Sequence, residues 1–174
     1  MKHLLRQFGL LAILVALMGG IAAPAAAAPR GPTIVDVAIA VNSSGPYAGQ
    51  FDTLIAAVLA ADPAVLATLA GNGQYTVFAP TDDAFAKLGL TPENVGVALD
   101  QQTLTSVLLY HVSPGRRASN AVIGSKRINT LGGGFLLQKG GVLTDNQGRT
   151  SNIIVTDVAA ANGIIHVIDT VVLP

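Results

Sequence analysis

The chain has 174 residues, with ten basic and ten acidic side chains and no cysteine. The lack of cysteine excludes disulfide bonds, thiol catalysis, cysteine-ligated iron–sulfur clusters and thiolate zinc sites. The balanced charge provides none of the basic surface that nucleic-acid binding requires, so nucleic acid is not an expected partner.

The first residues have the pattern of a secretory signal peptide. Lys2, His3 and Arg6 precede an apolar stretch from Phe8 to Ile21, and a run of small residues follows. The apolar stretch is shorter than the roughly 20 residues of a membrane-spanning helix. A basic start, a short apolar centre and a small-residue end together predict export and cleavage.

Cleavage near residues 25–28 divides the chain into a signal peptide (1–27), a flexible leader (28–32) and one domain (33–174). Loss of Lys2 and Arg6 leaves eight basic against ten acidic residues, a net charge near −2. The remaining chain of about 147 residues is long enough to be stable without disulfides. We expect a secreted monomer, extracellular, periplasmic or attached to the cell surface, with membrane contact only through the signal peptide.

Helical patterns dominate the first half of the domain. Thr33 and Asp36 have the spacing of a capping box, which predicts a helix to about residue 41. The apolar stripe from Phe51 to Leu59 predicts a second helix, buried on both sides because alanine fills its other face. A strand is expected over 74–79. Further helices are expected to start at Asp62, Thr81, Thr91 and Asp100.

Short apolar runs separated by turn residues fill the second half. They predict strands near 128–131, 135–138, 142–144, 152–156, 164–168 and 170–173. Helices followed by antiparallel strands indicate an α+β fold. The turn around Gly124-Ser125-Lys126-Arg127 is expected to be a solvated loop.

Three ordered segments resemble the fasciclin-like domain family. They are residues 76–85 (TVFAPTDDAF), 108–112 (LLYHV) and 162–174 (NGIIHVIDTVVLP). The resemblance covers about residues 33–174. It implies a wedge-shaped domain, an antiparallel β-sandwich or barrel with several short helices packed around it. It also implies binding outside the cell, through adhesion to an extracellular protein, to matrix or to a cell-surface component. Some members of the family instead carry a small apolar ligand such as a carotenoid, which is the alternative function.

The resemblance points to two candidate binding segments. The Tyr110-His111 pair lies in the segment linked to adhesion, and on a strand these neighbours would face opposite ways. Asp157-Val158 lies where adhesive relatives have an Asp-Ile pair. In both cases the alternative is a framework role, with the polar groups bonded within the protein.

No catalytic residues, cofactor or metal are expected. His166 shares a strand face with Ile164 and Ile168, so we expect a buried, hydrogen-bonded side chain rather than a zinc ligand. The chain contains none of the motifs Gly-x-Ser-x-Gly, Ser-x-x-Lys or His-Glu-x-x-His. A hydrolase is therefore only a remote alternative to a binding module.

Overall fold

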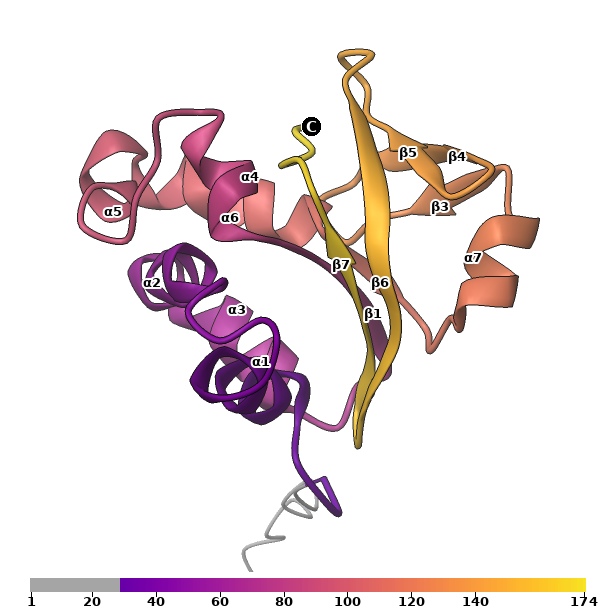
Figure 1. Cartoon of the computed structure of the whole chain (residues 1–174), viewed down its shortest axis with the longest axis horizontal. Helices are drawn as coiled ribbons and strands as arrows, with labels where there is room; N and C mark the ends of the chain where they lie inside the picture. The colour runs from indigo at the N-terminus through magenta and orange to yellow at the C-terminus, as the bar shows by residue number, and fades with distance from the viewer. Residues whose placement is uncertain (1–28) are drawn as a thin grey trace, which may run out of the picture.

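The computed structural model describes residues 29–174. The predicted signal peptide and the first residue of the predicted leader lie outside the described residues. Figure 1 shows α1, α2 and α3 on one side of three long strands, with β3, β4, β5 and α7 on the other. The helices are α1 (Ile34–Ser43), α2 (Asp52–Ala60), α3 (Pro63–Ala70), α4 (Asp82–Ala86), α5 (Val95–Ala98), α6 (Gln101–Tyr110) and α7 (Ser119–Gly124). The strands are β1 (Tyr75–Pro80), β2 (Val112–Pro114), β3 (Arg127–Asn129), β4 (Phe135–Lys139), β5 (Val142–Thr144), β6 (Thr150–Ala160) and β7 (Gly163–Ile168).

Most helices begin at the predicted capping residues. The Thr33–Asp36 capping box is formed, with the Thr33 backbone N–H donating to the Asp36 carboxylate at 2.8 Å. Asp62, Thr81 and Asp100 each accept a hydrogen bond from the first turn of the helix that follows. These side chains satisfy N–H groups that the helix itself leaves without partners. No single helix within residues 29–174 is long and apolar enough to cross a membrane. Helices α2 and α3 together have the necessary length and composition, but they are bent by 117° at the break between them.

Four local expectations for these elements were wrong. The helix expected to start at Thr91 is α5, which begins at Val95 with Asn94 as its N-cap. The second helix is not buried on both sides, because Leu59 is 69% exposed. Residues 170–173 do not form a strand, since the N–H groups of Val172 and Leu173 donate to the side chains of His111 and Asp145 instead. The stretch before residue 127 contains α7 rather than only a solvated loop, and Arg127 begins β3.

The seven strands form one sheet in the order β2-β1-β7-β6-β5-β4-β3. The pairs are antiparallel except that β1 and β7 run parallel. The two ends of the sheet approach each other, since the N–H of Leu131, just after β3, donates to Val112 O in β2 at 2.7 Å. The result is a nearly closed barrel with short helices around it, which confirms the expected α+β fold.

Strands β1 and β7 separate two hydrophobic cores. Alternate residues of a strand face opposite sides. On β1, Val77 and Ala79 therefore join the large core beneath the helices, whereas Phe78 joins a smaller core against β3, β4 and β5. On β7, Val167 faces the helical core and Ile168 the smaller one.

His166 lies on the smaller-core side of β7 and is fully buried, as predicted. Its ring stacks on Phe78 with centroids 5.8 Å apart. Nδ1 accepts from the backbone N–H of Asp157 at 3.2 Å, so the ring proton belongs on Nε2, which donates to Arg117 O at 3.0 Å. Both ring nitrogens thus have partners within the protein.

The helical layer is attached to the sheet by Asn162, in the turn between β6 and β7. Its buried side-chain carbonyl accepts from Ile34 N at 2.8 Å. Its amide donates to Leu69 O at 2.7 Å and to Gly71 O at 2.8 Å. One side chain therefore fixes the start of α1 and the end of α3 against the sheet.

Candidate functional site

Tyr110 and His111 lie at the end of a helix rather than on a strand. Tyr110 is the last residue of α6 and His111 its C-cap. Tyr110 is fully buried, and its hydroxyl donates to Phe135 O at 2.6 Å. Burial raises the pKa of Tyr110. Its side chain belongs to the smaller core, whereas His111 lines a pocket beneath the helical layer.

His111 is held as a neutral ring. Its Nδ1 lies 2.8 Å from Val107 O and must donate, because Nε2 accepts from Val172 N at 3.2 Å. Burial lowers the pKa of His111 to about 4, although the bond to Val107 and the charge of Asp145 act in the opposite direction. At neutral pH the imidazole is therefore uncharged.

Asp157 is exposed and lies in a bulge of β6, where the register to β7 shifts between Val155 and Val158. Its φ of 61° is the one positive value among the non-glycine residues that the structure describes. Both carboxylate oxygens accept from Ser119, one from the backbone N–H at 2.7 Å and the other from the hydroxyl. The hydroxyl bond and then the backbone bond hold the pKa of Asp157 below its usual value.

The side chain of Val158 is turned toward the protein interior, unlike that of Asp157. It is half-buried, packs against the large core, and lines a small hollow with Ala38 of α1 and Ile165 of β7. Tyr110, His111 and Val158 are thus turned inward, and Asp157 alone of the four predicted binding residues has an exposed side chain. Their roles in binding stay predictions.

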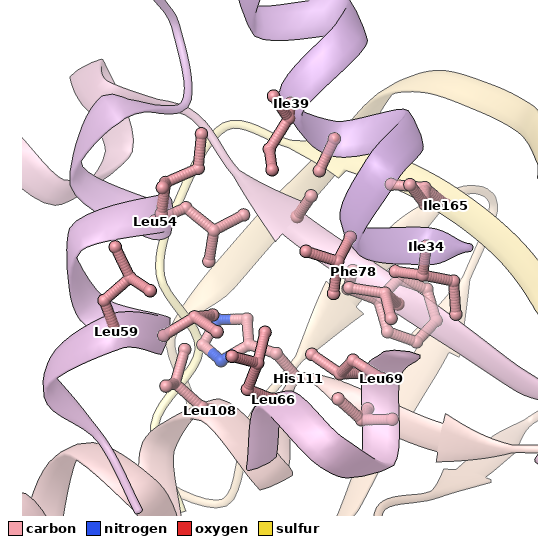
Figure 2. Close-up of a pocket in the computed structure, with 17 residues that line it drawn as sticks. Ile34, Ile39, Leu54, Leu59, Leu66, Leu69, Phe78, Leu108, His111 and Ile165 are labelled. Carbon is pink, nitrogen blue, oxygen red and sulfur yellow. The ribbon is translucent and has the colours of Figure 1, made fainter. Parts of the chain in front are cut away.

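Sequence reasoning did not locate an apolar pocket between α1, α2, α3 and the sheet (Figure 2). Its volume is about 140 Å³. Phe78, Leu108 and Ile165 contribute from β1, α6 and β7, and Leu54 and Leu66 from α2 and α3. The signal in the sequence is the run of Ala, Val, Leu and Ile through the three helices, but that pattern equally describes helices packed on a filled core.

The part of the chain that the structure describes contains no group of three or more His, Cys, Asp or Glu side chains placed to hold a metal ion. The candidate site is therefore described by two features: the exposed carboxylate of Asp157 and the apolar pocket beneath the helices.

Comparison with known proteins identifies relatives over most of the chain. A profile of the Fasciclin domain matches residues 49–174. The chain is 41% identical to Protein sll1483 of a Synechocystis species, over 86% of this chain and 77% of that one. It is 32% identical to the cell surface glycolipoprotein MPB83 of Mycobacterium bovis, over 89% of this chain and 70% of the relative.

The fold also has a counterpart among solved structures. A FAS1 domain pair from the insect cell adhesion molecule Fasciclin I superposes with a TM-score of 0.51 at 21% sequence identity. The match covers 67% of this chain and 42% of the domain pair. At this identity the likeness concerns the fold alone.

The neutral state of His111 predicts a loss of stability in mild acid. The unfolded imidazole binds a proton below about pH 6.5, whereas the folded one does so only near pH 4. The unfolded state therefore binds more protons in this window, and the free energy of unfolding should fall by about 2 kcal/mol between pH 7 and pH 5. Urea denaturation at both pH values measures the difference. The His111→Gln variant keeps a donor and an acceptor but does not titrate, so an unchanged pH dependence in it would contradict the assignment.

Proposed function

Because this chain belongs to the Fasciclin domain family, we propose that it is an exported binding module that mediates adhesion or contact with an extracellular protein, matrix or cell surface. One relative is a cell surface glycolipoprotein, which supports a role at the cell surface. The signal-peptide pattern of residues 1–27 supports export of the chain. The proposed activity is binding rather than catalysis.

The observation that carries the proposal is the exposed, immobilised carboxylate of Asp157. Each of its oxygens accepts one hydrogen bond from Ser119, and each retains a further lone pair for a partner. The backbone N–H of Asp157 is fixed in turn by His166. A carboxylate held in this way loses little conformational entropy when it binds a partner's Arg, Lys or bound cation.

The side chains of the other three predicted residues are turned into the domain. Val158 anchors the strand segment beside Asp157 to the large core. Tyr110 and His111 fix the end of α6 through their bonds to Phe135 and Val172. We propose that they position the binding surface without contacting the partner.

A second candidate function is favoured by the apolar pocket. A cavity of about 140 Å³ is larger than a packed interior normally leaves empty. It lies directly under three helices and is large enough for part of a small molecule. We propose as the alternative that the protein carries a small apolar ligand.

The Asp157→Asn variant tests the adhesive surface. Asparagine keeps the shape of the side chain and tolerates a positive φ, so the domain should fold while adhesion is lost. Adhesion of protein-coated beads to cells and to extracellular matrix is the measurement.

Asp83→Asn is the matched control, because it removes the charge of another exposed carboxylate, in the first turn of α4. We expect this variant to fold and to retain adhesion. Normal adhesion of a folded Asp157→Asn protein would show that Asp157 is only structural.

Export is tested by the intact mass of protein collected from the medium or the periplasm. The small residues before position 29 predict a mature chain that starts at residue 26 or 28. A full-length protein retained in the membrane would disprove the proposed cleavage.

The carrier function is tested on protein purified from its native source. Organic extraction followed by mass spectrometry should release a stoichiometric apolar compound, and visible absorbance would reveal a conjugated one. A protein that yields no such compound is not a carrier under those conditions.

A further inference from the structure

We infer that the pocket beneath α1, α2 and α3 binds an uncharged hydrocarbon group the size of one ring or a short branched alkyl chain, and that it rejects anions such as short carboxylates. This inference rests on the proposed carrier function and specifies the chemistry of its ligand. Size, polarity and charge each support it independently.

The size of the pocket limits what it can enclose. Its volume of about 140 Å³ resembles that of engineered apolar cavities of about 150 Å³ that hold one benzene molecule. A longer ligand can therefore place only one end inside. Ile39 and Leu59, which line the pocket and are 46% and 69% exposed, provide apolar surface on which the rest of such a molecule can lie (Figure 2).

The lining offers no hydrogen bond to a ligand. His111 is the one polar side chain among the described residues around the pocket. Both of its nitrogens already have partners, Val107 O and Val172 N. A hydroxyl or carboxylate carried into the pocket would lose its hydration without compensation, at a substantial cost in free energy. The enclosed end of the ligand must therefore be hydrocarbon.

The helices that enclose the pocket also lack any cation that could pair with an anionic ligand. Residues 31–100 contain seven acidic side chains and one basic side chain, Lys87. Asp36, Asp52 and Asp62 are the charged residues of α1, α2 and the α3 cap, and the three helices include no lysine or arginine. An anionic head group would find no cation on the helices that enclose its tail.

The test compares toluene with benzoate, two ligands with the same ring and different charge, at pH 7. Methyl resonances of Leu54, Leu66 and Leu108 in the exported protein report binding by NMR. We expect toluene to produce saturable shifts of these methyl groups, and benzoate to bind at least about tenfold more weakly. Benzoate binding as tight as toluene would overturn the selectivity for uncharged groups.

Two substitutions in α1 test the location. Ala38 lines the pocket and Ala40 is exposed on the same helix. Ala38→Leu should fill part of the cavity and weaken toluene binding at least about tenfold. Ala40→Leu, with the same change in volume, should leave binding unchanged. If Ala38→Leu does not fold, Val58→Phe in the pocket and Val97→Phe on the exposed face of α5 form a second matched pair.

The outcomes separate this inference from the carrier function on which it rests. A pocket variant that binds toluene like the unmodified protein overturns the location. If a compound is extracted from the native protein but toluene does not bind, the carrier function stands and the inferred ligand size is overturned. Failure of both experiments removes the carrier function together with the inference.

Discussion

The parallel pairing of β1 with β7 is the constraint on which the rest of the structure depends. These strands bury both faces and separate the two cores, so the helical layer and the strands β3 to β5 pack against opposite sides of one two-stranded wall. The pairing requires glycine at position 163, because a Cβ atom there would lie 2.2 Å from Tyr75 O. Without that close approach neither core could form in its present shape.

The two functional features use opposite faces of this wall. On the helical side, Val77, Ala79 and Ile165 belong to the large core and line the pocket. On the far side, His166 binds the backbone of Asp157 and fixes the bulge that presents the carboxylate. Both buried histidines have hydrogen-bond partners for their two ring nitrogens, and each therefore joins segments distant in sequence.

The sequence predicted those elements whose signals are local. Thr33, Asp62 and Asp100 lie beside the N–H groups that they cap, so a few residues sufficed to locate three helices. Helix α7 has no such cap, because its first N–H donates to Asp157, 38 residues further along the chain. The apolar residues 170–173 likewise have the sequence pattern of a strand. Nothing local in the sequence reveals that the N–H groups of Val172 and Leu173 donate to the distant side chains of His111 and Asp145. Whether apolar helices cover a filled core or an open pocket depends on where Asn162 holds them, which no periodicity reveals.

The Asn162-Gly163 turn has a consequence for chemical ageing. In a flexible chain, an asparagine followed by glycine deamidates readily, because the small glycine lets the next backbone nitrogen attack the side-chain amide. In the folded domain three hydrogen bonds immobilise the Asn162 amide in a buried site, which keeps it from that geometry. Deamidation would place a carboxylate against the carbonyl groups of Leu69 and Gly71, where it would be repelled. Molecules that stay unfolded for long would therefore lose the ability to reattach their helical layer.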